Sequence, residues 1–270
     1  MANKWKYIKA ELSCEGMPSL IAISETWLRQ WHDDSVISLE GYSLFRCDRG
    51  SRGGGVLLLA KDTLGPVPVN INFEEMASRD AVYDVLACDL INSKRAAEHI
   101  RICVVYSIPE ADYDQFRNLI RILSSLIDTA KGTVIICGDF NLPDMSWSTV
   151  TTAGDRRHKL MVDFCYQFGL IQFVHEPTRG ENILDLVLAT NGDAVSRVSV
   201  SPPTVDHAVV NFSLNVCSLP QGNPEVLALS TARRYVYVCA ESRSCRGAVY
   251  YIIIVGNRRK YVLAIYSCLT

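Results

Sequence analysis

Seven short runs of β-branched and aliphatic residues recur along the first 216 residues, and each has the length and composition of a β-strand. These runs span residues 20–24, 56–60, 82–90, 100–106, 133–137, 183–189 and 207–214. Apolar residues at helical spacing predict helices over 116–127 and 160–168, and a shorter amphipathic helix over 5–12. Many strands with a few helices indicate an α/β or α+β domain that spans residues 1–216.

The composition changes beyond this domain. Residues 217–270 hold seven Lys and Arg but only two Glu, a net charge of +5, whereas residues 1–216 carry −7. We therefore predict that 217–270 is a separate tail, an extension of different origin from the domain. Its basic charge with interleaved Tyr is also compatible with a nucleic-acid-binding patch. Residues 250–255 are β-prone and uncharged, which indicates one buried strand or, if unpaired, an aggregation-prone segment.

Several classes of protein are excluded by the remaining composition. The longest apolar run, 248–255, is far shorter than the roughly 20 residues that span a bilayer, so no membrane association is expected. The polar start predicts no secretory signal and hence an intracellular protein. Four cysteines lie in apolar runs and are predicted to be buried free thiols: Cys88, Cys103, Cys137 and Cys165. Ligand spacing for a structural zinc ion is missing from the sequence.

The segment Gly138-Asp139-Phe140-Asn141 follows an apolar strand and carries the first candidate functional groups. In an extended backbone, Asp139 and Asn141 share one face and Phe140 anchors the other. A carboxylate and an amide side by side suit the binding of a water molecule or a metal ion. The alternative is an Asx turn that closes the strand.

A second carboxylate, Asp185, interrupts the apolar run at 183–189. A lone buried carboxylate costs several kcal/mol, so Asp185 needs a partner. The Asp206-His207 pair offers an imidazole, and a carboxylate-bound imidazole is fixed in tautomer and able to contact a phosphate or move a proton. The alternative for His207 is a purely structural role.

Glu25 stands at the end of the apolar run 20–24, where it is either an ordinary solvated residue or a ligand. Mg²⁺ accepts carboxylate oxygens and leaves other positions to water and phosphate. Two strand-end carboxylates, an Asp-x-Asn and an Asp/His pair together indicate a metal-assisted phosphoester hydrolase.

These segments occur in the order seen in the endonuclease/exonuclease/phosphatase superfamily, which residues 1–216 resemble. The motifs are Ser-Glu-Thr-Trp-Leu at 24–28, Arg-Gly-Gly-Gly-Val at 52–56, Val-Tyr-Ser-Ile-Pro at 105–109, Gly-Asp-Phe-Asn at 138–141, Pro-Thr-Arg at 177–179, Leu-Asp-Leu-Val-Leu at 184–188 and Asp-His at 206–207. The sequences of these motifs are most similar to the apurinic-type endonuclease domain of non-LTR retrotransposons. The resemblance implies a four-layer αββα sandwich of two mainly antiparallel sheets, Mg²⁺ (or Mn²⁺) as cofactor, and DNA as the substrate that is nicked.

The resemblance also implies roles for individual residues. Glu25 would ligate the metal ion. Asp139 would orient or deprotonate the attacking water, with Asn141 beside it. His207, oriented by Asp185, would hydrogen-bond the scissile phosphate.

Two further positions receive roles in the same way. Asp206 would lie near the metal ion or the leaving group, and Tyr106 would contact the phosphate, unless it only caps the core. Arg46 and Arg52 would touch the DNA backbone, or Arg46, Arg49 and Arg52 would belong to a solvated loop. The Gly triplet at 53–55 is read as a tight turn, because it lacks the Walker spacing.

The sequence departs from the family pattern in two places, and these departures leave alternatives to the leading function open. Family members begin with a strand that carries an active-site Asn, which is expected to be missing here, and Val205 replaces the usual Ser before Asp-His. A catalytically inactive remnant or binding module is therefore one alternative. A phosphatase of inositol phosphates or lipid head groups is the other, although the extra loops of such enzymes are missing from the sequence. Action on genomic DNA would require a nuclear location.

Overall fold

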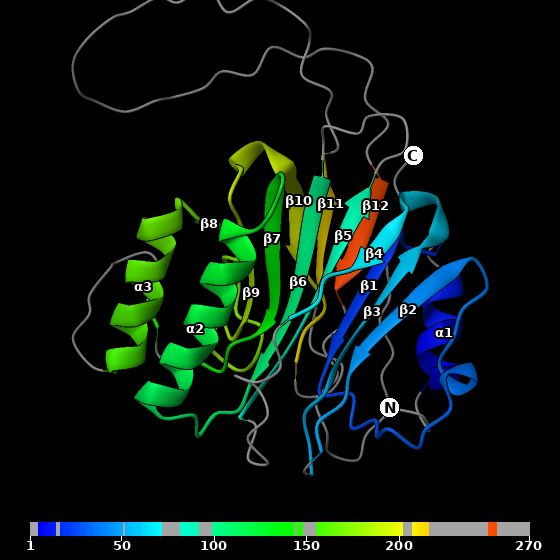
Figure 1. Ribbon diagram of the computed structural model, residues 1–270, viewed down its shortest axis with the longest axis horizontal. Coiled ribbons are helices and arrows are strands. Elements are labelled where there is room, and N and C mark those ends of the chain that lie inside the picture. The colour runs from blue at the N-terminus through cyan, green and yellow to red at the C-terminus, as the bar shows by residue number, and fades with distance from the viewer. Residues whose placement is uncertain are drawn as a thin grey trace, which may run out of the picture.

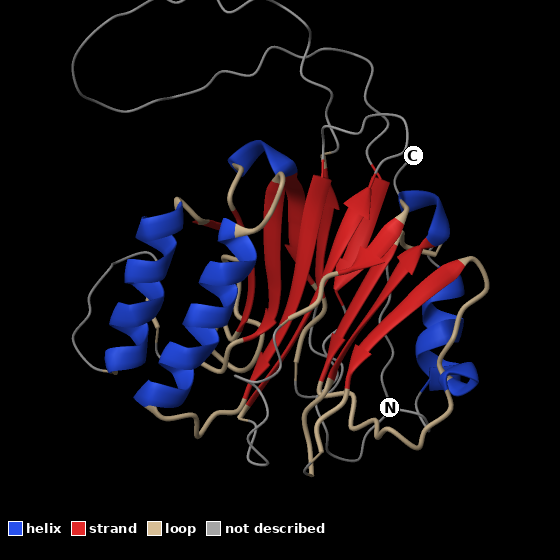
Figure 2. Cartoon of the chain, viewed as in Figure 1, coloured by secondary structure: helices blue, strands red, loops and turns tan. Residues whose placement is uncertain are grey.

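The computed structural model is a sandwich of two six-stranded sheets with helices on both outer faces (Figures 1 and 2). It describes residues 5–14, 17–50, 52–71, 82–91, 99–143, 145–147, 155–201, 207–215 and 248–252. One apolar core lies between the sheets, a second lies beneath α2 (Tyr113–Asp128) and α3 (Arg156–Phe168), and a third lies beneath α1 (Trp5–Cys14). This arrangement confirms the predicted αββα layers.

The first sheet joins strands from both ends of the chain. Its order is β10 (Val195–Val200), β11 (Val210–Leu214), β12 (Ala248–Ile252), β1 (Leu20–Ser24), β3 (Val56–Lys61) and β2 (Tyr42–Cys47). Neighbours are antiparallel except for the parallel pair β1 and β12.

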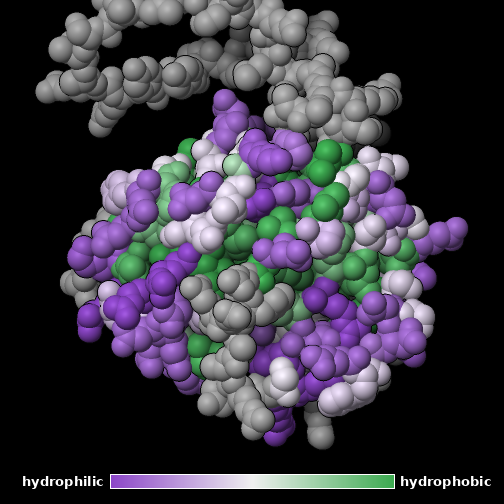
Figure 3. Space-filling view, viewed as in Figure 1, coloured by the Kyte–Doolittle hydropathy of each residue, from purple (hydrophilic) through white to green (hydrophobic). Residues whose placement is uncertain are grey.

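The second sheet carries α2 and α3 on its outer face. Its order is β4 (Pro66–Pro68), β5 (Tyr83–Ile91), β6 (His99–Ser107), β7 (Thr133–Asp139), β9 (Asp185–Ala189) and β8 (Ile171–Gln172). Only β6 and β7 run parallel, with α2 as the crossover between them. The surface over α2 and α3 in Figure 3 is mostly hydrophilic, because the apolar residues of α2 face the sheet.

All seven predicted strands are present, with ends that shift by at most three residues. Strands β2, β4, β8 and β10 were not predicted from the sequence. In β2 every residue is half-buried, and β8 has two residues. These strands lack the continuous burial that marks the central strands, so their sequences carry a weak strand signal.

The free thiols are also confirmed among the described residues. Cys88, Cys103 and Cys137 are buried, whereas Cys165 is half-buried rather than buried, because it lies on the partly exposed flank of α3. Burial raises the pKa of the Cys88 thiol to about 12, so it is protonated and unreactive at neutral pH.

Within the described part of the chain, none of the helices has both the length and the apolar character that crossing a bilayer requires. The predicted domain boundary at residue 216 falls within a segment outside the described residues. Strand β12 is the part of 217–270 that the structure places.

The start of α2 is fixed by a reciprocal capping box. Asp112 Oδ1 accepts a hydrogen bond from the backbone N–H of Gln115, and Gln115 Oε1 accepts one from the backbone N–H of Asp112, both at 2.8 Å. Replacing Asp112 with Ala is expected to lower the free energy of unfolding by about 1 kcal/mol, because one helix N–H loses its acceptor. Urea denaturation measures this loss, and an unchanged midpoint would contradict it. Asp112→Asn keeps the acceptor and serves as the control.

Candidate active site

A row of polar side chains crosses the second sheet at one end of the core between the sheets. The backbone register pairs each member with the next across β5, β6, β7 and β9. The row is Asp84, Tyr106, Asp139 and Asp185. Two positions further along each strand, on the same face, the corresponding row is apolar and belongs to the core. Strand alternation therefore directs three carboxyl groups and a phenol to the same end of the sandwich.

Gly138 explains why the row can form on β7. Its φ is +136°, and a Cβ atom there would lie 1.9 Å from the carbonyl oxygen of Val105 on β6. Only glycine permits this close approach of the two strands. The parallel pairing that results sets Asp139 beside Tyr106.

Asp139 and Asn141 lie together at the end of β7, as predicted, but through a turn rather than through extended backbone. Asn141 has a φ of +47°. Asp139 Oδ1 accepts its backbone N–H at 2.9 Å, and Asp139 Oδ2 accepts its side-chain Nδ2 at 3.0 Å. The same Nδ2 donates to the carbonyl oxygen of Ser107 at 2.6 Å. The Asx turn is thus present, and it holds the Asp139 carboxylate in a fixed orientation. Phe140 is buried beneath α2 and α3.

His207 lies between two carboxylates and is buried. Its Nδ1 is 2.9 Å from Asp185 Oδ2, and its Nε2 is 3.9 Å from Asp139 Oδ2. The predicted pairing of Asp185 with His207 is therefore present in the structure. The bond to Asp185 fixes the ring so that Nε2 faces Asp139.

The electrostatics of this cluster are strongly coupled. Burial lowers the pKa of His207, but Asp185 and then Asp139 outweigh that effect and raise it to about 9. Burial raises the pKa of Asp139 well above its usual value, and the negative charge of Asp185 raises it further, while His207 opposes both. The His207 ring is therefore an imidazolium at neutral pH, because the two acidic neighbours favour its charged form.

Glu25 reaches the row from the opposite sheet. It follows the last residue of β1, has a φ of +51°, and accepts a 2.6 Å hydrogen bond from the hydroxyl of Tyr106. Non-glycine residues in the left-handed region are uncommon and concentrate at functional sites. Burial raises the pKa of Tyr106, and the Glu25 carboxylate raises it further, so the phenol keeps its proton at neutral pH.

Thr178 is a structural support of the site that sequence reasoning left without a role. Its hydroxyl oxygen accepts the backbone N–H groups of Leu184 and Asp185 at 3.0 and 3.1 Å. Its carbonyl oxygen accepts the N–H of Ala208. Thr178 thus joins the start of β9 to the residue after His207. The Pro-Thr-Arg motif at 177–179 includes this residue, but the motif alone predicts none of these contacts.

The roles predicted for two other site residues are not tested by the described part of the chain. Asp206 and Val205 are outside the described residues, so the metal-binding role of Asp206 stays a prediction. Arg52 is exposed on a bend, and its contact with DNA likewise stays a prediction.

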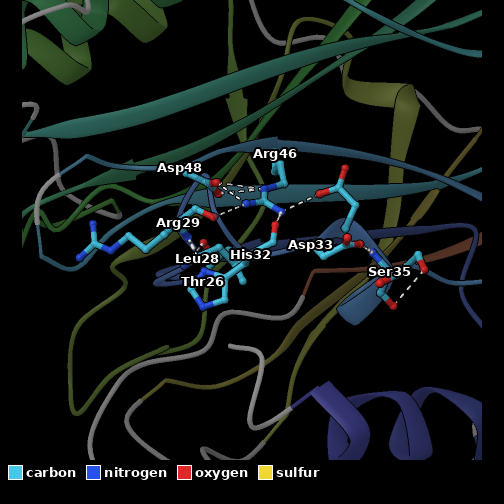
Figure 4. Close-up of polar contacts among 10 residues, drawn as sticks. Thr26, Leu28, Arg29, His32, Asp33, Ser35, Arg46 and Asp48 are labelled. Atoms are coloured by element: carbon cyan, nitrogen blue, oxygen red, sulfur yellow. Dashed lines mark hydrogen bonds and ion pairs between the residues drawn. The ribbon is translucent and has the colours of Figure 1, made fainter.

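Arg46 has an internal role instead of a place in a solvated loop. Its guanidinium bonds Asp48, Asp34 and the carbonyl oxygens of Arg29 and His32 (Figure 4). These bonds tie strand β2 to the loop that follows Glu25. With its donors engaged in this way, Arg46 braces the loop beside the site.

Placing Arg49 in a solvated loop is wrong, because it is buried in an ion pair with Asp84 that supports the other end of the row. Arg49 Nη2 lies 2.7 Å from Asp84 Oδ2, with side chains 5% and 3% exposed, and the guanidinium lies over the ring of Tyr106 at 5.1 Å. Asp84 Oδ2 also accepts the backbone N–H of Gly55 at 2.7 Å. A Cβ atom on Gly54 would lie within 2.6 Å of both members of the pair. The Gly triplet therefore packs against the ion pair with positive φ at all three residues. Gly53 lies in a bend and the next two glycines in no assigned turn, so the tight turn stays a prediction.

The donors present fit a divalent metal ion. Asp139 and Asp185 offer carboxylate oxygens within 4.8 Å of each other and of the His207 ring, whose charged form has no free electron pair for a metal ion. Asp185 Oδ1 is buried and has no hydrogen-bond partner among the described residues. A buried carboxylate oxygen without a partner needs a cation or a water molecule, and carboxylate oxygens are the ligands that Mg²⁺ prefers. With Glu25 beside Tyr106, three carboxylates surround the same end of the core.

The raised pKa of His207 gives a direct prediction for the metal-free chain. Its imidazole is expected to titrate near pH 9 in NMR spectra, rather than near the ordinary value of about 6.5. Because the folded pKa is raised, the stabilisation is complete below the unfolded pKa and is lost as the pH rises through about 9. Asp185→Asn should lower the midpoint. A midpoint near 6.5 in both proteins would contradict the ion pairs.

The αββα sandwich, with an acidic and histidine-containing cluster at one end of the core, is the arrangement that the resemblance to the endonuclease/exonuclease/phosphatase superfamily predicts. Residues 100–211 match the family described as endonuclease-reverse transcriptase. This match includes Tyr106, Asp139, Asp185 and His207, and it confirms the resemblance inferred from the motifs. No protein among the curated sequences matches the chain.

Solved structures share this fold at low sequence identity. The endonuclease domain of TRAS1, a telomere-specific non-LTR retrotransposon, has a TM-score of 0.56 at 14% identity and covers 76% of this chain and 88% of that one. The 3′ phosphatase NExo from Neisseria, bound to a product DNA hairpin, has a TM-score of 0.58 at 14% identity and covers 78% and 94%. An AP endonuclease from Archaeoglobus fulgidus has a TM-score of 0.56 at 13% identity and covers 78% and 94%.

Proposed function

We propose that this chain is a Mg²⁺-dependent phosphodiester hydrolase that nicks DNA, derived from a non-LTR retrotransposon. The observation that carries the proposal is the buried Asp185–His207–Asp139 arrangement beside the Glu25–Tyr106 pair. It brings together a fixed imidazolium, a carboxylate that can act as a base, and carboxylate oxygens that can bind a metal ion. These are the groups that hydrolysis of a phosphate ester needs.

His207 would bind the phosphate. Its Nδ1 is held by Asp185, so Nε2 is the atom left to donate a hydrogen bond to a phosphate oxygen. With a pKa of about 9 the ring is charged at neutral pH, and the bond to the anionic phosphate is charge-assisted. Tyr106 keeps its hydroxyl proton, and its O–H, which donates to Glu25 in this structure, would turn to a phosphate oxygen when the Glu25 carboxylate holds the metal ion.

Asp139 would orient the attacking water and accept its proton. The Asx turn with Asn141 holds the carboxylate in place, and its raised pKa makes it a stronger base than an ordinary aspartate. Glu25 would hold Mg²⁺ together with the oxygen of Asp185 that has no partner. The ion supplies charge neutralisation of the phosphate oxygens in the transition state.

DNA as the substrate is supported by the neighbours with this fold. They include a retrotransposon endonuclease, an AP endonuclease and an enzyme bound to a DNA product. The family match to endonuclease-reverse transcriptase points the same way.

An end-labelled DNA duplex tests the proposal and separates it from a phosphatase reaction. Incubation with Mg²⁺ is expected to shorten the labelled strand at internal positions. A second duplex with a 3′-terminal phosphate provides the comparison. Release of inorganic phosphate without strand shortening would replace the endonuclease proposal with a phosphomonoesterase. A lack of both reactions would support the inactive remnant.

A further inference from the structure

Strand β12 occupies a central position in the first sheet although it comes from the far end of the sequence. It lies between β1 and β11 in Figure 1. Along β11 it forms a five-residue antiparallel ladder, from the Val210–Ile252 pair to the Leu214–Ala248 pair. Along β1 it forms a parallel ladder in which Ile21 pairs with Tyr251.

The two strands that flank β12 have no direct pairing with each other. β1 pairs with β3 and β12, and β11 pairs with β10 and β12. Since neighbouring strands lie about 4.8 Å apart, β1 and β11 are separated by about 10 Å across β12. Without β12 the sheet would consist of two pieces, β10–β11 and β1–β3–β2, each with an unpaired edge beside the core.

The local sequence suits a central strand. Residues 248–252 read Ala-Val-Tyr-Tyr-Ile, with β-branched and aromatic residues and neither charge nor Pro. By contrast, the edge strand β4 contains two Pro in three residues. The sequence left two interpretations of this segment open, one strand within the fold or an unpaired, aggregation-prone segment. The ladders to β1 and β11 favour the strand.

We propose that residues 248–252 are an integral strand of the folded domain, and that they join the two pieces of the first sheet. The strand also sets the spacing of the site, because Glu25 follows β1 and His207 precedes β11. The composition change at residue 217 is then not the end of the folded unit. This proposal is independent of the chemistry that the site performs.

Hydrogen exchange on the full chain tests the strand directly. In peptides that cover 248–252, the amides are expected to exchange at least about 100-fold more slowly than in an unstructured chain, because a central strand donates its N–H groups to two ladders. Exchange at the unstructured rate, while β1 and β11 stay protected, would overturn the proposal.

A proline variant provides the second test. Pro at position 251 removes a ladder hydrogen bond, so Tyr251→Pro is expected to lower Tm by about 10 °C, whereas Tyr251→Phe should stay within about 2 °C of the parent. In the proline variant, exchange should rise first in β1 and β11, while β6 and β7 stay protected. Equal stability of the two variants, or exchange that rises equally in all strands, would contradict a local joining role.

Discussion

Replacing Asp139 with Asn is expected to lower the rate of DNA nicking by about 10³-fold, the largest effect expected of a single change. Asn has nearly the same shape but cannot accept a proton from water, and it binds metal ions more weakly. The Asx turn would be preserved, because the amide oxygen can still accept the backbone N–H of Asn141. The loss should therefore fall on the chemical step, which single-turnover nicking measures.

The matched control is Asp163→Asn on the exposed face of α3, where the carboxylate forms an exposed ion pair with Lys159. Its nicking rate should equal that of the parent. Thermal unfolding of Asp139→Asn is expected somewhat below the parent temperature, because the change removes one partner of the buried His207 imidazolium and the acceptor of the Asn141 side chain, so both rates are measured well below either midpoint. A rate within tenfold of the parent would remove Asp139 from the proposed chemistry.

Replacing Arg49 with Met is expected to have the largest effect on stability, a loss of about 3–5 kcal/mol in the free energy of unfolding. The change leaves the Asp84 carboxylate buried without its partner and removes the guanidinium from the ring of Tyr106. The backbone N–H of Gly55 remains as a donor to Asp84 but cannot neutralise its charge. Urea denaturation measures the loss.

The pH dependence of this loss identifies its cause. Burial already raises the pKa of Asp84 and Arg49 opposes that rise, so removal of Arg49 should raise the pKa further. A carboxyl group whose pKa is higher in the folded than in the unfolded chain takes up a proton on folding. The free energy of unfolding therefore falls as the pH rises. The deficit of Arg49→Met should therefore be smaller at pH 5 than at pH 8.

Arg117→Met is the control for the Arg49 experiment. Arg117 pairs with Asp114 on the surface of α2, with side chains 53% and 74% exposed. Such exposed pairs contribute about 0–1 kcal/mol, so this variant should unfold near the parent midpoint at both pH values. Equal losses for the two variants would show that the buried pair contributes no more than a surface pair.

The parts of the fold that sequence predicted share one physical property, which is continuous burial. β1, β6 and β7 lie between covered faces, so most of their residues are apolar and stand out from the surrounding chain. The edge strands β2 and β8 are half-exposed and carry mixed residues. Local pattern does not separate such strands from loops.

The candidate site shows the same division between local and long-range information. Asp139 and Asn141 are two residues apart, and their turn is readable from the motif. The Glu25–Tyr106 bond joins residues 81 positions apart on opposite sheets. The Arg49–Asp84 pair joins positions 35 apart. These contacts depend on strand order and register, which composition and periodicity leave open.

The most direct test of the proposed nuclease site is the nicking of supercoiled plasmid by the full chain, with Mg²⁺ and with a chelator in its place. We expect conversion to the open-circular form only with Mg²⁺, and loss of this conversion in Glu25→Ala and His207→Ala. Conversion that is equal with the chelator, or that persists in both variants, would contradict the assignment of the site.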